Sequence, residues 1–254
     1  MARLFNILNP NETHIMSKQG SDKAEYEIKA PTASWEEDEG FRNGPCERWR
    51  KALLCIDLQY LGCSEECGTF DQHLYSSIPT EAVQEYLQTV RTEVIPNVQT
   101  LQNHFRQRAY EVIHCRIQCM TQDGRDRSPE HKKLGLYAPP GSRAAAFLPE
   151  VAPIDDEIII NKTASGVFIA TNIEYILRNL CVSDLVVCGV TTNECISSAV
   201  RSACDLGFRV TVVSDATAGI TRELHDASLL IMQDRYAAVM NTRETLEMLE
   251  PEIR

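Results

Sequence analysis

The sequence lacks any long apolar run. None of its apolar segments approaches the roughly 20 residues of a membrane-spanning helix. The N-terminal stretch MARLFNILNPNETH also lacks the apolar core of about 7–15 residues that marks a secretory signal. We therefore expect a cytoplasmic protein with no membrane partner.

Positive charge is also scarce. The 254 residues include 25 Lys and Arg against 36 Asp and Glu, which gives a formal net charge of −11. This charge opposes a phosphate-binding surface over the whole molecule, so we expect no nucleic-acid partner. Glycine and proline number only 12 and 11, too few for a fibrous or low-complexity chain. A content of 43% hydrophobic and 24% charged residues is ordinary for a globular protein.

Ten cysteines are present, and their positions decide how they are interpreted. Cys55 in ALLCID and Cys188 in LVVCGV lie inside apolar runs, where cysteine behaves as a small core hydrophobe. That pattern favours a reducing compartment. Two segments, CSEEC and CRIQC, have a spacing that permits weak metal binding, but ordinary thiols are the preferred interpretation. We predict no metal site and no cofactor.

Residues 1–50 differ from the remainder of the chain. They hold scattered charges, the acidic run EEDE and little periodicity. We predict an N-terminal arm over residues 1–50, in which the acidic run is a solvated loop. Residues 51–254 are predicted to form the functional domain.

Short apolar runs alternate with segments of helical periodicity after residue 51. Runs that are apolar throughout are typical of strands buried on both faces, as in a parallel sheet. The alternation predicts a doubly wound α/β domain, with a mostly parallel six-stranded sheet and helices on both faces. The predicted strands are Ala52–Asp57, Glu111–Cys115, Glu157–Asn161, Leu185–Val190, Arg209–Ser214 and Ala237–Asn241. The predicted helices are Thr80–Gln107, Ala144–Leu148, Asn172–Leu180, Asn193–Leu206, Arg222–Arg235 and Arg243–Leu249. The segment from 118 to 150 has no clear period and is predicted to be a long functional loop.

Three of the predicted strand ends carry reactive side chains. The first strand ends in Asp57, the third is followed by Lys162, and the fourth leads into Cys195. Because the carboxyl ends of parallel strands share one edge of a sheet, these side chains can converge in space. Together they make a nucleophile site in principle, although each alone is more often structural.

Cys195 has the strongest physical case of the three. Thr191 and Glu194 fit a capping box with Thr191 as the N-cap, so Cys195 falls in the first turn of a helix. Unpaired N–H groups and the positive end of the helix dipole favour a thiolate there. The same N–H groups could hold an oxyanion.

Four segments in consistent order resemble the isochorismatase-like cysteine hydrolase superfamily. This superfamily includes nicotinamidases, N-carbamoylsarcosine amidase, biuret and ureidoacrylate hydrolases, and isochorismatases. The segments are ALLCIDLQ, NKTASGVFIAT, VVCGVTTNECISSAVRSACDLGF and RVTVVSDATAG. The resemblance covers about residues 50–250 of the chain, and it implies an α/β fold of the same kind.

The resemblance also implies a catalytic triad in this chain. It places the general base at Asp57, the catalytic lysine at Lys162 and the nucleophile at Cys195. It further implies a cis peptide bond between Val190 and Thr191. The N–H groups of Thr191 and Cys195 would then form the oxyanion hole.

Four residues are candidates for substrate binding. Gln59 matches a family position near the site, with a loop hydrogen bond as the structural alternative. Arg116 follows a strand end in a basic segment and could pair with a substrate carboxylate; ordinary surface charge is its alternative. Phe168 matches an aromatic that approaches the pocket in relatives, with core packing as an equal alternative, and Arg235 aligns loosely with a polar-contact position of the biuret hydrolases. His225 is predicted to have a capping or packing role.

Two features separate the branches of the superfamily. The segment HCRIQCMTQDGRDRSPEH lacks the D-x-H motif through which nicotinamidases bind a metal. A cysteine at the nucleophile position favours C–N cleavage through a thioester, as in the N-carbamoylsarcosine amidase, biuret hydrolase and ureidoacrylate hydrolase branch. We predict an amidohydrolase that releases ammonia from a small carbamoyl, ureido or amide substrate, with or without a carboxylate. The alternatives are isochorismatase-type vinyl-ether hydrolysis and a non-catalytic scaffold. By resemblance, we expect a homo-oligomer, either a dimer or a tetramer.

Overall fold

The structure is a computed structural model, and it describes residues 50–67, 70 and 78–250. The predicted N-terminal arm, residues 1–50, lies outside the described residues except for Arg50.

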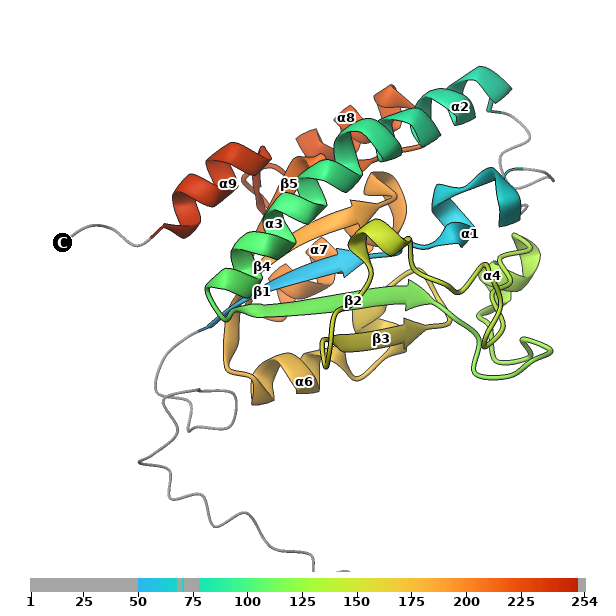
Figure 1. Ribbon diagram of the computed structural model, residues 1–254, viewed down its shortest axis with the longest axis horizontal. Coiled ribbons are helices and arrows are strands. Elements are labelled where there is room, and N and C mark those ends of the chain that lie inside the picture. Colours follow the sequence, from blue (N-terminus) through green and yellow to red (C-terminus); the bar gives the residue numbers. More distant parts are fainter. Residues whose placement is uncertain (1–49, 68–69, 71–77, 251–254) are drawn as a thin grey trace, which may run out of the picture. The chain divides into compact units, whose positions relative to one another are not determined.

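The described domain is built on a parallel sheet of six strands in the order β3-β2-β1-β4-β5-β6 (Figure 1). The chain runs from β1 outward to β3, returns to the other side of β1, and then runs outward again to β6. The strand order therefore reverses between β1 and β4, where open α/β sheets place their ligands. This confirms the predicted doubly wound sheet. Its strands are β1 (Arg50–Ile56), β2 (Glu111–Ile117), β3 (Ile158–Lys162), β4 (Val182–Val190), β5 (Arg209–Ala218) and β6 (Ala238–Met240).

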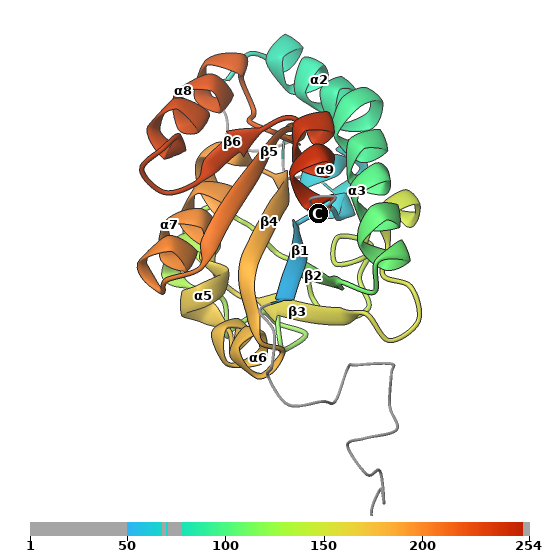
Figure 2. The ribbon, with the colours of Figure 1, turned by 90° about the vertical axis from the view of Figure 1, so that its left-hand side faces the viewer.

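Helices cover both faces of this sheet (Figure 2). One face carries α2 (Thr80–Thr89), α3 (Ile95–Gln107) and α9 (Thr242–Leu249). The other carries α5 (Val167–Ala170), α6 (Ile173–Asn179), α7 (Ser197–Asp205) and α8 (Arg222–Met232). A π-helical turn, Val90–Val94, joins α2 to α3, so together they form the long helix that the periodicity predicts. The short helices α1 (Tyr60–Cys63) and α4 (Pro129–Lys133) lie beyond the carboxyl ends of the strands, and 3₁₀ turns occupy Glu65–Cys67 and Pro149–Val151.

Alternate residues of β1 are buried on opposite faces of the sheet. Leu53 and Cys55 pack in the core beneath α2, α3 and α9, whereas Leu54 and Ile56 pack in the core beneath α6 and α7. None of the four is more than 1% exposed. A strand covered on both faces has to be apolar along its buried length. Asp57 is therefore the first polar side chain that the segment presents after β1.

The predicted helix Ala144–Leu148 is wrong. Its backbone instead runs beside the segment after β1, where the Tyr60 N–H donates to the Ala146 carbonyl at 3.0 Å and Gln59 forms a bridge with Phe147. Because these backbone groups pair with another segment, they cannot form a helix. The short helices α1, α4 and α5 were not predicted, since four or five residues are too few to show a helical period.

Eight cysteines in the described part of the chain are free thiols, and six of these are buried. Cys55 and Cys188 pack in the core, as their apolar context in the sequence predicts. Cys181, in contrast, is disulfide-bonded. The free thiols and this disulfide do not agree on the redox compartment, and the reducing, cytoplasmic location stays a prediction. Within residues 50–67, 70 and 78–250, no helix is long and apolar enough to cross a membrane.

Candidate active site

The structure brings the three predicted catalytic side chains together at the point where the strand order reverses. Asp57 follows β1 directly, Lys162 is the last residue of β3, and Cys195 lies in the turn after β4. The Lys162 Nζ lies 2.9 Å from the Asp57 Oδ2 and donates to the Cys195 Sγ at 3.3 Å. Lys162, Asp57 and Cys195 are 0%, 5% and 6% exposed. These contacts are therefore shielded from bulk water.

The backbone around Asp57 turns sharply. Asp57 has a φ of 55°, in the left-handed region that is uncommon for residues other than glycine and in which aspartate is comparatively well tolerated. Its N–H donates to the Cys115 carbonyl at 2.8 Å, and its carbonyl accepts from the Gln59 N–H at 2.8 Å. These two bonds fix the turn and with it the position of the carboxylate beside Lys162.

Lys162 keeps its charge in this buried setting. Burial is the largest single effect and lowers the pKa of its ammonium, but the Asp57 carboxylate, Cys195 and Cys115 together raise it by more, so the net pKa lies above the ordinary value. Breaking a buried ion pair by removing one partner is strongly destabilising, because the other charge is left uncompensated. Removing either Lys162 or Asp57 alone is therefore expected to destabilise the folded protein.

The Cys195 thiol is neutral in the resting site. Burial raises the pKa of this thiol, the Asp57 carboxylate raises it further, and the Lys162 ammonium offsets these effects only in part. In the resting protein, desolvation and a neighbouring negative charge outweigh the backbone N–H groups that favour a thiolate. A base must remove the thiol proton as the sulfur reacts, and Asp57 is placed to do so.

Alkylation of Cys195 by iodoacetamide is expected to keep accelerating well above the ordinary cysteine pKa of about 8.5. Only the thiolate reacts, so a raised pKa moves the plateau of the rate to higher pH. The modified fraction of Cys195 can be followed by peptide mass spectrometry, with free cysteine as the reference. A rate that levels off at or below about pH 8.5 would contradict a raised pKa of the Cys195 thiol and would indicate a thiolate in the resting protein.

The nucleophile turn, defined as residues 191–196, differs from the predicted capping box. The peptide bond between Val190 and Thr191 is cis, as the resemblance implies. Thr191 is the N-cap, but its hydroxyl caps no backbone N–H; instead the Glu194 N–H donates to the Thr191 carbonyl at 3.1 Å. Residues 192–196 form a π-helical turn. Gly189 before it has a φ of 115°, and a Cβ there would lie 2.0 Å from the Ile56 carbonyl oxygen, so only glycine fits.

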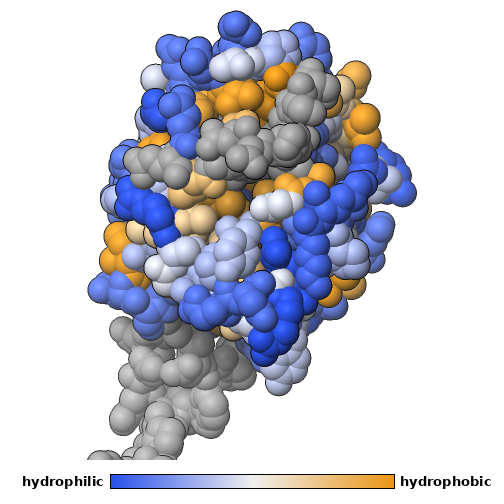
Figure 3. All heavy atoms as spheres, turned by 90° about the vertical axis from the view of Figure 1, so that its right-hand side faces the viewer, coloured by the Kyte–Doolittle hydropathy of each residue, from blue (hydrophilic) through white to orange (hydrophobic). Residues whose placement is uncertain are grey.

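A cavity opens directly on Cys195. Figure 3 views this end of the molecule and shows apolar residues within a mostly hydrophilic rim. The apolar residues that line the cavity are Leu61, Gly62, Phe70, Ile117, Leu136, Val190 and Ile220. The polar ones are Asp57, Gln59, Ser165, Thr191, Glu194 and Cys195. No lysine, arginine or histidine is among the described residues that line it.

Gln59 lines the cavity, but its amide is occupied by the backbone. Its Oε1 accepts from the Ile117 N–H at 2.6 Å, and its Nε2 donates to the carbonyls of Ile117 and Ala144 at 2.9 and 2.8 Å. These bonds clamp the segment after β1 to the end of β2 and to the loop before η3 (Pro149–Val151). The structural alternative weighed for Gln59, a loop hydrogen bond, is what the structure shows.

The other three predicted substrate-binding residues do not line the cavity. Arg116 donates to Asn161 Oδ1 and to a backbone carbonyl, and its guanidinium stacks 4.9 Å from the centre of the Phe147 ring. Phe168 packs against the core that includes Ile196 and Val200. Arg235 is exposed and stacks on the neighbouring tyrosine. Their observed partners are structural, and we do not propose them as substrate contacts.

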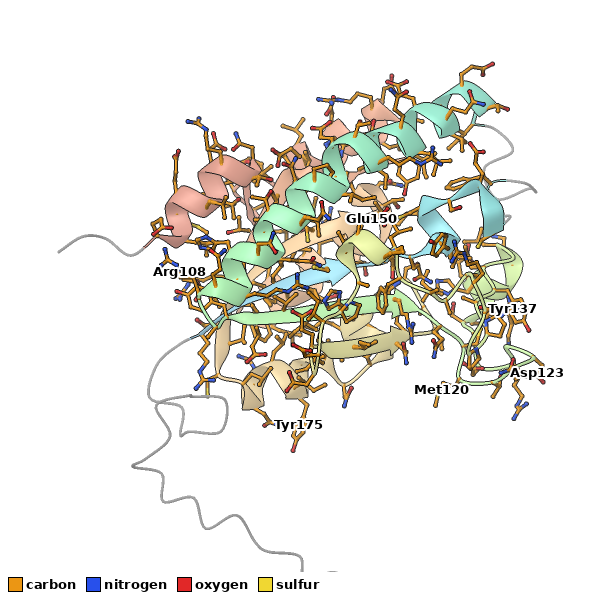
Figure 4. All side chains as sticks on the ribbon, viewed as in Figure 1. Arg108, Met120, Asp123, Tyr137, Glu150 and Tyr175 are labelled. Atoms are coloured by element: carbon orange, nitrogen blue, oxygen red, sulfur yellow. The ribbon has the colours of Figure 1, made fainter. Side chains whose placement is uncertain are left out.

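The basic segment after β2 is a surface loop whose charges have local partners. Arg125 forms an ion pair with Asp123 at 3.1 Å, and both side chains are exposed. The Arg127 guanidinium lies 4.9 Å from the centre of the Tyr137 ring. Met120, Asp123 and Tyr137 lie in this loop, at the end of the molecule beyond β2 and β3 (Figure 4). The observed pairing agrees with the interpretation as ordinary surface charge.

Several cavity residues escaped the sequence analysis. Ser165 stands three residues after Lys162 in a segment that the resemblance had already marked, so it could have been proposed. Leu136 and Ile220 come from connections without a periodic pattern, and nothing in the sequence links them to Cys195. Among the residues that the structure describes, no group of three or more His, Cys, Asp or Glu side chains is arranged to hold a metal ion.

The sequence matches a known family over most of its length. A model of the isochorismatase domain matches residues 51–244. Maleamate amidohydrolase of Pseudomonas putida is 28% identical over 109 residues, which are 43% of this chain and 51% of that protein. A probable inactive nicotinamidase of Arabidopsis thaliana is 30% identical over 191 residues, 74% of this chain and 91% of that protein. As with the Pseudomonas protein, this chain matches no more than two thirds of the length of several other curated relatives.

Solved structures share the fold. An isochorismatase family protein from Desulfovibrio vulgaris superimposes with a TM-score of 0.66 at 21% identity, covering 80% of this chain and 99% of that one. At this level of identity the likeness concerns the architecture alone, and it agrees with the six-stranded sheet described above.

Proposed function

The chain belongs to the isochorismatase family of hydrolases, and we propose that it is a cysteine-dependent amidohydrolase. Its substrate would be a small carbamoyl, ureido or amide compound whose C–N bond is cleaved through a thioester, with release of ammonia. The observation that carries this proposal is the contact of Asp57, Lys162 and Cys195 at the base of a cavity. The similarity to a maleamate amidohydrolase supports it.

The geometry supports a mechanism in which Asp57 is the general base. Asp57 takes the Cys195 proton as the sulfur attacks the carbonyl carbon, and the carbonyl electrons move onto oxygen. Collapse of this tetrahedral species breaks the C–N bond. Asp57 returns the proton to the leaving nitrogen, and the acyl group stays on Cys195 as a thioester. Water, deprotonated by Asp57, then hydrolyses the thioester and regenerates the thiol.

Two further groups would stabilise the charges of this cycle. The N–H groups of Thr191 and Cys195 are proposed to bind the oxyanion, because they belong to the turn that lines the cavity beside the sulfur. Lys162 holds Asp57 in place and donates to the sulfur, so it stabilises the negative charge that builds up there. No step needs a metal or a cofactor.

The described lining favours a neutral acyl group. Its apolar side chains would surround a substrate chain, and its described residues offer hydroxyl groups but no cationic partner for a carboxylate, which is costly to bury without one. We therefore propose a small neutral amide in preference to one that carries a carboxylate.

Butyramide is expected to be hydrolysed with a kcat/KM at least about tenfold higher than succinamate, which corresponds to about 1.4 kcal/mol. The two amides have the same chain length and differ in a terminal methyl against a carboxylate, so each controls for the other. Ammonia release measured over a range of concentrations gives the ratio. Equal values, or a preference for succinamate, would contradict the neutral-substrate proposal.

Ammonia release from a panel of ureido, carbamoyl and primary-amide compounds tests the proposed reaction itself. Release from at least one compound is expected. The alternative of vinyl-ether hydrolysis would instead yield pyruvate and 2,3-dihydro-2,3-dihydroxybenzoate from isochorismate, with no ammonia. The scaffold alternative predicts neither product. It is supported by the plant relative whose name describes a probable inactive nicotinamidase. A cytoplasmic location and a homo-oligomeric state remain predictions alongside this proposal.

A further inference from the structure

Behind the nucleophile turn, three buried side chains form a chain of hydrogen bonds. The Thr192 hydroxyl lies 2.9 Å from the His225 Nδ1 and 3.1 Å from the Thr217 hydroxyl. Thr192, Thr217 and His225 are 0%, 2% and 8% exposed. They come from the turn after β4, from β5 and from α8, so the chain ties three separate elements together.

His225 is itself firmly held. It lies in the first turn of α8, whose N-cap Thr221 accepts from the Leu224 N–H, and the His225 N–H donates to the Thr221 carbonyl at 3.1 Å. Gly219 approaches so closely that a Cβ there would lie 2.9 Å from the His225 backbone nitrogen. The backbone of His225 is therefore held in place, and its Nδ1 meets the hydroxyl of Thr192.

The bonding pattern suits a neutral imidazole. Burial lowers the pKa of His225, and Arg222 lowers it further, against the opposing effect of Asp226. A neutral ring can accept a proton at Nδ1 from the Thr192 hydroxyl or donate one to it, depending on the tautomer. In either case the Thr217 hydroxyl is a second partner of the Thr192 hydroxyl, which is therefore held from two sides.

Thr192 is directly connected to the proposed catalytic groups. It follows Thr191, whose carbonyl accepts from the N–H groups of Glu194 and Ile196 at 3.1 and 3.3 Å. These bonds span Cys195. A rotation at Thr192 would therefore move both the Thr191 N–H and the Cys195 sulfur relative to the substrate carbonyl.

We propose that His225 and Thr192 are positioning residues, which hold the nucleophile turn so that the Cys195 sulfur and the Thr191 N–H face the same carbonyl group. This replaces the capping or packing role predicted for His225 from the sequence. The inference rests on the proposed roles of Cys195 and Thr191, but it adds residues that touch neither the substrate nor the sulfur.

Thr192→Val removes the hydroxyl and keeps the shape of the side chain, and His225→Leu removes its partner. Each is expected to lower kcat by about 10- to 100-fold, because a small displacement of reacting groups has effects of that size. KM should change little, since neither residue lines the cavity. Thr192→Ser and His225→Asn keep a polar atom at the required place and should restore most of kcat.

A matched control is available in α9, on the opposite face of the sheet from α7 and α8. Thr245 is 0% exposed, and its hydroxyl donates to the Asn241 carbonyl at 2.8 Å. Thr245→Val therefore removes a buried threonine hydroxyl away from Cys195. It should lower the melting temperature and leave kcat unchanged.

The double variant Thr192→Val/His225→Leu separates positioning from independent effects. If the two residues act through one hydrogen bond, the double variant should be no slower than the slower single variant. Losses of kcat that multiply, or variants that lose thermal stability with an unchanged kcat, would overturn the proposal. If Thr192→Val does not fold, the comparison of His225→Asn with His225→Leu carries the same test.

A second measurement needs no substrate. The rate of Cys195 alkylation by iodoacetamide is expected to change several-fold in Thr192→Val and His225→Leu, and to stay constant in Thr245→Val. Changed alkylation in a protein that releases no ammonia would refute the proposed function and leave the positioning inference standing. Unchanged alkylation together with unchanged kcat would refute the positioning inference alone.

Discussion

Replacing Lys162 with methionine is expected to abolish ammonia release and to lower the free energy of unfolding by about 3–5 kcal/mol. Methionine has a similar length but carries no charge. The Asp57 carboxylate, 5% exposed, would lose the ammonium that lies 2.9 Å away. The Cys195 sulfur would also lose the donor at 3.3 Å. Urea unfolding measures the loss of stability, and an ammonia assay measures the loss of activity.

The ion pair between Arg222 and Asp226 is a matched control for the stability effect. Its two atoms are also 2.9 Å apart, but the side chains are 74% and 54% exposed. Arg222→Met should therefore cost no more than about 0.5 kcal/mol, as is usual for exposed pairs on a helix.

Removing both buried charges separates the cost of an unpaired charge from the value of the pair. Asp57→Asn/Lys162→Met should recover part of the stability that Lys162→Met loses, because no uncompensated charge remains. It should not recover activity, since the proposed base is gone. A Lys162→Met protein as stable as the wild type would show that the buried Asp57 carboxylate is not destabilised by losing its ammonium partner. That result would contradict the proposed dependence of Asp57 on Lys162.

Replacing Cys195 with alanine is expected to lower kcat by about 10⁴-fold or more, because the proposed nucleophile is lost. The fold should persist, since the substitution removes one sulfur atom from a side chain at the edge of a cavity. Circular dichroism and urea unfolding check the fold, and the ammonia assay reports kcat.

Cys204→Ala is the control for this variant. Cys204 lies in α7 on the same continuous segment, is half-buried, and does not line the cavity. Its kcat should match that of the wild type. Comparable activity in Cys195→Ala and Cys204→Ala would contradict a nucleophilic role for Cys195.

The sequence was most informative where a local pattern determines the structure. The six strands could be predicted because β1 and β4 are apolar almost throughout, as burial on both faces requires. Asp57, Lys162 and Cys195 could be placed together because parallel strands end at one edge. The cis bond before Thr191 followed from the resemblance, and the structure contains it.

The errors arose where contacts between distant segments decide the outcome. Ala144–Leu148 has residues that suit a helix, but its backbone pairs with residues after β1. The Cys195 thiol looked activated from its place in a turn, but burial and the Asp57 carboxylate act on it across the fold. Arg116 looked available for a substrate, but its guanidinium stacks on the Phe147 ring of a different segment. These contacts join residues far apart in the sequence, so no motif with a fixed spacing predicts them.

The most direct test of the central claim is the partition of the proposed thioester between water and hydroxylamine. An amide and its N-methylamide are hydrolysed separately in the presence of hydroxylamine, and the ratio of hydroxamate to free acid is measured for each. If both pass through the same acyl group on Cys195, the two ratios will be equal, although ammonia leaves one substrate and methylamine the other. Ratios that differ with the leaving group would mean that the acceptor attacks before the C–N bond breaks, and the thioester mechanism would be wrong.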